Sequence, residues 1–218
     1  MTHAPTPETA RSVSRRWPLI SGGIAVLTVL ALGLIIFIRG NLPFEADLEW
    51  MEEILENRHP LLELPALLMD FIGGGWFGVI VVPVGGIILL CILRRFWAAL
   101  YFGAASIVSA AAVQGLKALI GRPRPEDMLV TADVGSFPSG HVANAATLAV
   151  VLGIIVWRLW VWVAGAVYVV LMALSRTYLG AHWVSDTIGG LILGAAVAVI
   201  VWAPLANRLR VEADSKRR

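Results

Sequence analysis

The chain has 218 residues, of which 58% are hydrophobic and 15% charged, and its mean hydropathy is +0.80. This composition excludes an ordinary water-soluble domain and predicts a membrane protein. The single cysteine, Cys91, excludes an intrachain disulfide framework and a cysteine-based zinc or iron–sulfur site, and the net charge of +2 does not argue for nucleic-acid binding.

Six stretches are long and apolar enough to cross a bilayer as helices, because about 20 apolar residues span about 30 Å of hydrocarbon. They are Trp17–Ile38, Phe71–Leu93, Phe96–Leu116, Val134–Trp157, Leu159–Ser175 and Thr187–Asn207. The first is too long for a cleavable signal and ends without a small-residue cleavage site, so we interpret it as a retained anchor. The sequence therefore predicts an all-α, six-transmembrane-helix bundle over residues 17–207, with tails at 1–16 and 208–218.

The link between the first two spans, residues 41–70, is acidic and carries Phe44, Leu48, Met51 and Leu55 at helical spacing. Such a pattern is typical of a short amphipathic helix on a membrane surface. Two interpretations stay open: a helix that only links two spans, and a lid over a substrate entrance.

The last span contains Gly190 and Gly194, four residues apart. Small residues at this spacing are typical of close helix packing in membranes. We interpret the pair as a packing site rather than as part of the chemistry.

Basic residues indicate the orientation, because Lys and Arg gather on the cytoplasmic side of membrane proteins. With six alternating spans, the two termini share one side with the links that follow the second and fourth spans. That side holds 11 of the 17 basic residues: Arg11, Arg15, Arg16, Arg94, Arg95, Arg158, Arg208, Arg210, Lys216, Arg217 and Arg218. We therefore expect a multi-pass protein of the plasma membrane, most simply a bacterial inner membrane, with cytoplasmic termini.

Three polar clusters interrupt the apolar chain within residues 117–186, and the order of the spans places all three on the outer, periplasmic or extracellular side. The clusters are Lys117–Pro125, Pro138–His141 and Ser175–Asp186. Ionisable groups at membrane depth cost on the order of 2.5–3.5 kcal/mol each, so four cations and two histidines gathered there indicate a function. Because the clusters contain few acids, they favour an anion, and arginine suits phosphate oxygens.

The two histidines have neighbours that suit catalysis. His182 and Asp186 are four residues apart, which on a helix puts both side chains on one face. The carboxylate can then accept from one imidazole nitrogen and leave the other unprotonated as a nucleophile. Ser139 can cap the helix that begins near His141, and Gly140 lets the backbone approach an anion closely. Capping alone explains Ser139 and Gly140 but not His141.

The three clusters together resemble the signature of the type-2 phosphatidic acid phosphatase superfamily, which includes lipid phosphate phosphatases and vanadium haloperoxidases. The signature is Lys-x6-Arg-Pro, then Pro-Ser-Gly-His, then Ser-Arg-x5-His-x3-Asp, and this sequence fills every position from Lys117 to Asp186 in that order. The resemblance implies a membrane lipid phosphatase that works through a phosphohistidine intermediate. Six apolar spans disfavour a soluble haloperoxidase.

The resemblance also implies a role for each residue of the signature. His182 would attack phosphorus, Asp186 would orient His182, and His141 would protonate the leaving oxygen and later activate water. The residues that would bind the phosphate are Lys117, Arg124, Ser139, Gly140 and Arg176.

No metal or other cofactor is implied, since these cations already oppose the phosphate charge. Glu126, Asp127 and Asp133 are interpreted as solvated loop acids rather than metal ligands. Arg122 lies outside the signature, and it can be read either as a contact for a second phosphate or as a contact for lipid headgroups.

The expected partners are the membrane and a lipid phosphate, with no nucleic acid. The substrate would be an isoprenyl diphosphate such as undecaprenyl diphosphate, or a glycerophospholipid phosphate such as phosphatidate or phosphatidylglycerol phosphate. Two alternatives remain: a lipid phosphotransferase that uses the same phosphohistidine, and a non-catalytic membrane protein.

Overall fold

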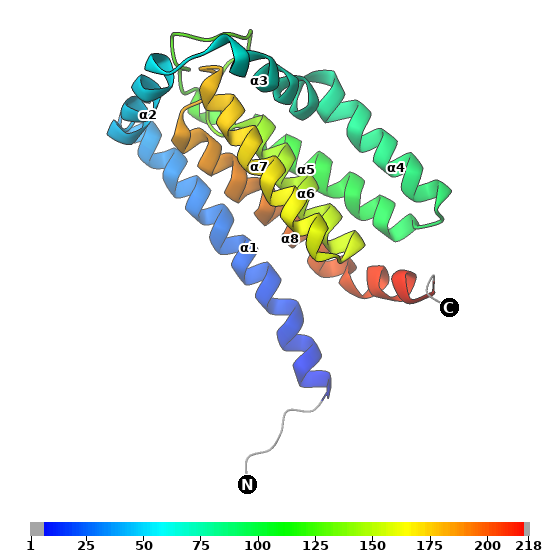
Figure 1. Ribbon diagram of the computed structural model, residues 1–218. Helices are drawn as coiled ribbons and strands as arrows, with labels where there is room; N and C mark the ends of the chain where they lie inside the picture. The colour runs from blue at the N-terminus through cyan, green and yellow to red at the C-terminus, as the bar shows by residue number, and fades with distance from the viewer. Residues whose placement is uncertain (1–6, 216–218) are drawn as a thin grey trace.

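The computed structural model describes the backbone of residues 7–215 and the side chains of residues 16–215, and all secondary structure in this part of the chain is helical. The elements are α1 (Pro7–Ile38), α2 (Glu45–Glu56), α3 (Pro60–Gly73), a π-helical turn η1 (Phe77–Val81), α4 (Val82–Ile92), α5 (Phe96–Ile120), α6 (Gly140–Val156), α7 (Leu159–Tyr178) and α8 (Val184–Ser215). The long helices form a bundle, and α2 and α3 lie at one end of it (Figure 1). The predicted all-α class is confirmed.

Within the described residues, four helical segments are long and apolar enough to cross a membrane: Arg16–Ile38, α5, α7 and α8. Neither α3 nor the continuous η1–α4 segment is long and apolar enough alone, but the two together are, and the pair is bent by 44°. The helix α6 is apolar but has 17 residues and falls among the shorter helices. The prediction of six spans is therefore confirmed only in part, with four spans, or five if the bent pair is counted as one.

The second predicted span, Phe71–Leu93, is not one straight helix. The helix α3 ends at Gly73, Gly75 has a positive φ of +54°, and η1 begins only at Phe77. A Cβ at Gly74 would overlap the His141 imidazole, so only glycine allows this approach. The break frees backbone carbonyls, and the Asn144 amide donates to the carbonyls of Gly73 (3.1 Å) and Gly78 (3.0 Å). The bend is thereby tied to α6.

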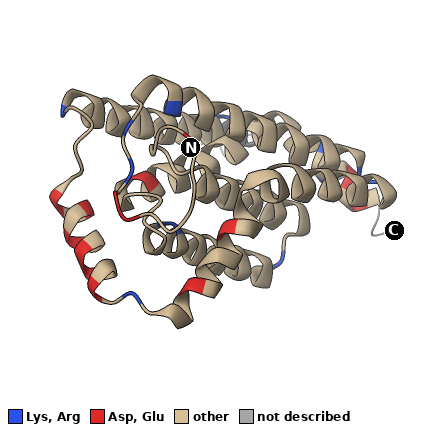
Figure 2. Cartoon of the chain, turned by 90° about the horizontal axis from the view of Figure 1, so that it is seen from above, with Lys and Arg blue, Asp and Glu red and all other residues tan. Residues whose placement is uncertain are grey.

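The predicted outer segment, residues 41–70, forms two helices instead of one. The helix α2 begins after Phe44, whose N–H donates to the Asp47 carboxylate at 3.1 Å, and α3 begins at Pro60, a residue that suits the first turn of a helix. Figure 2 shows a run of acidic positions along α2, with further acidic positions nearby at this end of the molecule. Only Asp47 and Met51 of α2 are buried, so a carboxylate as well as an apolar side chain anchors this helix.

The helix α6 lies between α5, α7 and α8, and its contact with α8 is especially close. A Cβ at Gly190 would lie 2.5 Å from the Ser139 carbonyl oxygen, and one at Gly194 would overlap the carbonyl oxygen of Ala143. The interpretation of the glycine pair as a packing site is confirmed. This packing holds the start of α6 against the start of α8.

Both segments that were predicted to be tails, residues 1–16 and 208–218, are partly helical: α1 begins at Pro7, and α8 ends at Ser215. Residues 1–6 and 216–218 lie outside the described residues, and so do the side chains of Arg11 and Arg15. The start of α1 and the end of α8 lie away from the end of the bundle that carries α2 and α3 (Figure 1).

The close α6–α8 contact predicts that Gly194→Ala destabilises the protein. The added Cβ would force the two backbones apart, and overpacking of this kind typically costs about 1–3 kcal/mol. Thermal or denaturant unfolding in detergent micelles measures the change. Gly115→Ala is the matched control, because a Cβ at Gly115 would have no neighbour within 4 Å. Equal unfolding midpoints for the two variants would contradict the packing assignment.

Candidate active site

The structure brings the three polar clusters together at one end of the bundle. The first lies at the end of α5 and in the loop after it, the second starts α6, and the third runs from the end of α7 to the start of α8. Gly121 ends α5 in the left-handed conformation, with φ +62° and its N–H donating to the Lys117 carbonyl. The two prolines that follow, Pro123 and Pro125, cannot continue the helix.

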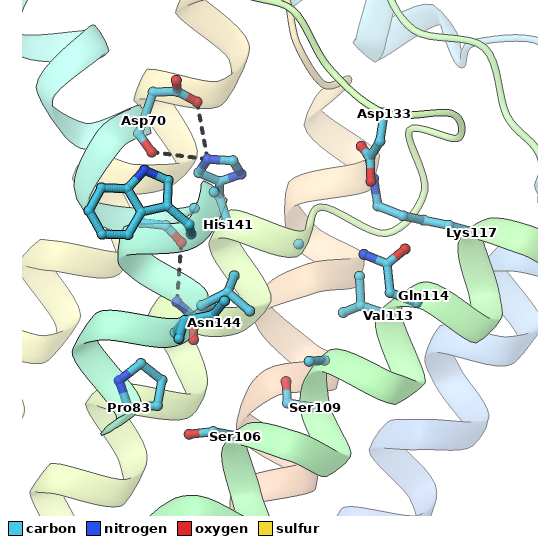
Figure 3. Close-up of a pocket in the computed structure, with 18 of the residues that line it drawn as sticks. Asp70, Pro83, Ser106, Ser109, Val113, Gln114, Lys117, Asp133, His141 and Asn144 are labelled. Atoms are coloured by element: carbon cyan, nitrogen blue, oxygen red, sulfur yellow. Dashed lines mark hydrogen bonds and ion pairs between the residues drawn. The ribbon is translucent and has the colours of Figure 1, made fainter. Parts of the chain in front are cut away.

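A cavity of about 910 Å³ lies where the clusters meet. The predicted site residues that line it are Lys117, Arg124, Gly140, His141, Arg176 and His182. The other two predicted site residues, Ser139 and Asp186, are fully buried outside this lining. Figure 3 shows His141 with Asp70 on one side of the cavity and Lys117 with Asp133 on the other.

His182 is almost fully buried, and its two ring nitrogens have different surroundings. Its Nε2 lies 3.3 Å from Arg124 Nη1. Because a guanidinium can only donate, this contact makes Nε2 an acceptor and assigns the ring proton to Nδ1. The ring therefore turns an unprotonated nitrogen toward Arg124, a residue of the cavity lining.

The predicted geometry of His182 and Asp186 differs from the structure in two respects. The helix α8 begins at Val184, so His182 lies in the preceding turn and not on a helical face shared with Asp186. The distance from His182 Nδ1 to Asp186 Oδ2 is 3.7 Å, which is longer than a hydrogen bond. The pair is thus close enough for electrostatic interaction, and such contacts commonly tighten only when substrate is bound.

The surroundings of His182 oppose its protonation. Burial contributes most, and the positive charges of Arg176, Arg124 and Lys117 add to it, so the pKa of His182 lies well below the ordinary 6.5. The ring is neutral at pH values where an exposed histidine is half protonated. A neutral imidazole is the form that can attack phosphorus.

Asp133 forms ion pairs with two of the predicted phosphate-binding cations. Its Oδ1 accepts from Lys117 Nζ at 3.1 Å and from Arg124 Nη2 at 2.7 Å. Burial raises the pKa of Asp133, but Lys117 and Arg124 outweigh burial and hold it below its ordinary value, so the carboxylate stays ionised. The interpretation of Asp133 as a solvated loop acid is confirmed, because its side chain is 57% exposed, but the carboxylate also forms ion pairs with two cations of the site.

Asp70 likewise pairs with two predicted site residues, on the other wall of the cavity. Its Oδ1 accepts from Arg176 Nη1 and lies 3.1 Å from His141 Nε2. Sequence reasoning missed this residue, although an acid directly before an apolar run is a signal that was present. A phosphate bound between His141, Arg176, Lys117 and Arg124 would have to replace the contacts of two carboxylates.

Ser139 occupies the N-cap position of α6, but its side chain makes no capping hydrogen bond. Within the described part of the chain, the buried Ser139 Oγ has no hydrogen-bond partner at all. Gly140 is the first residue of α6, where a backbone N–H has no acceptor within the helix. The predicted capping role is therefore wrong for the side chain, whose hydroxyl is buried outside the cavity lining. The helix N-terminus at Gly140, a lining residue, is left available to an anion.

Arg122 contacts neither lipid headgroups nor the cavity, so both interpretations of it are wrong. It is fully buried, its Nη1 donates to Asp186 Oδ1 at 2.6 Å, and its Nη2 donates to Asp47 Oδ2 at 2.8 Å. Asp47 was also missed, because no local spacing links it to a partner 75 positions away in the sequence.

Comparison with known proteins gives one family and several relatives. The model of the PAP2 superfamily matches residues 98–210. Decaprenylphosphoryl-5-phosphoribose phosphatase of Mycobacterium tuberculosis is 32% identical over 151 residues, which cover 65% of this chain and 82% of that protein. Undecaprenyl-diphosphatase of Sulfolobus acidocaldarius is 36% identical over 78 residues, so the match spans 36% of this chain and only 34% of that relative.

Solved structures are also similar over most of the chain, and one of them is a Bacillus subtilis protein. It is described as the first transmembrane PAP2 type phosphatidylglycerolphosphate phosphatase from Bacillus subtilis, and it aligns with a TM-score of 0.69 and 28% sequence identity. The alignment covers 83% of this chain and 94% of that one.

The low pKa of His182 predicts that its ring remains neutral at pH 6.5 and titrates only at lower pH. The sign follows from burial and the nearby cations, both of which disfavour the imidazolium. NMR of ¹⁵N-histidine-labelled protein in detergent measures the protonation, and the spectrum of His182→Asn identifies the signal. A His182 ring half protonated at pH 6.5 or above would refute the assigned environment.

Proposed function

The chain is an integral membrane protein that belongs to the PAP2 superfamily, and on this premise we propose that it is a lipid phosphatase. Its substrate would be an amphiphile with a phosphate or diphosphate headgroup. One observation carries the proposal: His182, His141 and three cations line a single cavity at one end of an apolar bundle. That arrangement supplies a nucleophile, a proton donor and an anion site within reach of one phosphate.

The proposed reaction has two steps. First, His182 Nε2 forms a bond to the terminal phosphorus, and the bond from that phosphorus to the leaving oxygen breaks, which is the lipid oxygen of a monophosphate or the bridging oxygen of a diphosphate. His141 gives that oxygen a proton. Second, His141 takes a proton from water, whose oxygen attacks the phosphohistidine and releases inorganic phosphate with restoration of the His182 ring. Asp186 orients His182 and balances its developing positive charge.

The phosphate oxygens would be bound by Lys117, Arg124, Arg176, the Ser139 hydroxyl and the Gly140 N–H. Charge develops on these oxygens in the transition state, so preorganised donors in a site that excludes water stabilise it most strongly. The start of α6 supports this assignment, because Gly140 lines the cavity. The Ser139 hydroxyl is adjacent to Gly140 and has no hydrogen-bond partner in the described part of the chain, but it would have to turn into the cavity to reach the phosphate.

The cavity also has an apolar part that suits a lipid tail. It continues from the histidines between η1 and α4 on one side, with Ile80 and Val84, and α5 on the other, with Ile107 and Ala110. A substrate could keep its tail among these side chains while its phosphate reaches His182. The names of the relatives support an isoprenyl diphosphate, such as undecaprenyl diphosphate, or phosphatidylglycerol phosphate as the substrate.

We further propose six membrane crossings, counting the bent pair of α3 with η1–α4 and the helix α6. At about 1.5 Å per residue, the 17 residues of α6 extend about 25 Å, which is close to the thickness of the hydrocarbon layer. Six crossings put both termini on one side, and the basic residues favour the cytoplasm of a bacterial inner membrane. The site would then open on the periplasmic side.

We predict that His182→Ala lowers phosphate release by roughly 10³-fold or more, because the nucleophile is lost. The assay measures inorganic phosphate from undecaprenyl diphosphate, phosphatidate and phosphatidylglycerol phosphate in detergent micelles. His59→Ala, which changes an exposed histidine outside the cavity, is the control and should keep full activity. Undiminished release by a folded His182→Ala variant would end the proposed mechanism.

The same assay separates two remaining questions. Metal independence stays a prediction, so activity is expected to survive EDTA, and inhibition that magnesium reverses would contradict it.

A lipid phosphotransferase would use the same phosphohistidine, so products are compared with and without a lipid or sugar acceptor. Transfer to the acceptor in place of phosphate release would favour that second function.

The membrane orientation predicts that a cysteine at Thr131 reacts with a membrane-impermeant maleimide in intact cells. Thr131 is exposed in the loop between α5 and α6, whereas Ser215 is exposed at the far end of α8. Both cysteines are introduced into a Cys91→Ser background, which removes the exposed native thiol. We expect Thr131→Cys to label in intact cells and Ser215→Cys to label only after the membrane is opened. The reverse pattern would invert the proposed topology.

A further inference from the structure

Beside the cavity lies a buried charged chain of three side chains, Asp47, Arg122 and Asp186, contributed by α2, the loop after α5, and α8. Their exposed fractions are 2%, 0% and 0%. None of the three lines the cavity, so none is placed to contact the substrate. Charges buried this deeply are costly unless they are paired, and removing one partner leaves the other charge buried without compensation.

Arg122 determines which way the carboxylate of Asp186 faces. Its Nη1 donates to Oδ1 of Asp186, while Oδ2 accepts from the Trp183 N–H at 2.9 Å and is the oxygen nearest to His182 Nδ1. With Oδ1 engaged by the guanidinium, Oδ2 is left for the imidazole. Arg122 therefore acts on His182 through Asp186.

Asp47 in turn holds Arg122 and the first turn of α8. Its Oδ2 accepts from Arg122 Nη2 at 2.8 Å and from the Ser185 hydroxyl at 2.7 Å, and its Oδ1 accepts from the Ser185 N–H at 2.8 Å. Arg122 Nη1 also donates to Ser185 Oγ at 2.8 Å. Ser185 is adjacent to Asp186, so these bonds fix the backbone that carries the catalytic carboxylate.

The charge of Asp47 also changes what Arg122 does to Asp186. A guanidinium paired with Asp186 alone would draw the negative charge of that carboxylate away from His182. A second carboxylate on the opposite nitrogen shares the guanidinium, and Asp186 keeps more of its ability to stabilise an imidazolium or a phosphohistidine.

We propose, resting on the function proposed above, that Arg122 and Asp47 are positioning residues for the His182–Asp186 pair. Through them, the outer helix α2 supports the catalytic machinery in addition to linking two spans. The acidic segment whose role the sequence left open thus has a defined contribution to catalysis.

The test is Asp47→Asn, which keeps the shape of the side chain and removes its charge. We expect kcat per folded molecule to fall roughly 10- to 100-fold, a loss typical when a residue that orients a reacting group is altered. KM should stay within about twofold, because Asp47 does not line the cavity. Glu49→Gln is the matched control: it removes the same charge from an exposed position of α2, and both constants should be unchanged.

Two further variants separate positioning from simple structural support. Arg122→Lys keeps the positive charge, but one ammonium group cannot reproduce the two-sided contact of a guanidinium, so kcat should fall. Asp47→Glu restores the carboxylate and should recover part of kcat. Should Asp47→Asn fail to fold, Ser185→Ala carries the same test, because it removes the hydroxyl between Asp47 and Arg122 without removing a charge.

An NMR measurement that does not require catalytic turnover tests this inference independently of the proposed function. The ¹⁵N signals of the His182 ring should shift in Asp47→Asn and not in Glu49→Gln. If the wild type releases no phosphate from any lipid tested, the proposed function fails, while the NMR shift still decides whether Asp47 acts on His182. Unchanged kcat and an unshifted His182 signal in folded Asp47→Asn, or a change in unfolding temperature alone, would overturn the positioning role.

Discussion

The organisation of this protein depends on pairing the charges that surround the cavity at one end of an apolar bundle. A lone charge in such surroundings is expensive, so the cations that gather around the cavity need carboxylates nearby. Those carboxylates come from separate elements: Asp70 from α3, Asp133 from the loop after α5, Asp186 from α8 and Asp47 from α2. The ion pairs therefore join α2, α3 and the loop after α5 to the ends of α5, α7 and α8, and the site and the fold stabilise each other.

The same pairing bears on the proposed chemistry. Lys117 and Arg124 share Asp133, while Arg176 and His141 share Asp70. A ligand with a single negative charge gains little by replacing these contacts, whereas a phosphate with two charges and several acceptor oxygens can satisfy all four groups together. His182 differs from its neighbours, because burial and the surrounding cations keep it neutral. A neutral nucleophile beside cations that can turn from carboxylates to a phosphate is what an attack on a phosphate requires.

Much of this could be predicted from the sequence, because the strongest signals are local. Apolar runs predicted the helices α5, α7 and α8, and the spacing of the three polar clusters predicted the residues that meet at the cavity. The glycine pair at 190 and 194 predicted close packing for the same reason. In each case the information lies within one helix or one short motif.

The features that sequence reasoning missed depend on tertiary contacts. The apolar run Phe71–Leu93 conceals a bend at Gly74 and Gly75, because the reason for that bend is the His141 ring on another helix. The clusters seemed poor in acids, yet Asp70 and Asp47 reach them from a different part of the chain. Arg122 resembles a headgroup contact in a linear motif, and only the fold shows that two carboxylates enclose it.

The bend between α3 and α4 has a consequence for the division of the cavity. Backbone carbonyls released by a broken helix must find donors in a membrane, and the Asn144 amide serves two of them, one turn along α6 from His141. Figure 3 shows Pro83 of α4 on one side of Asn144 and His141 with Asp70 on the other. A single amide thus marks the boundary between the compartment suited to hydrocarbon and the chamber suited to phosphorus chemistry.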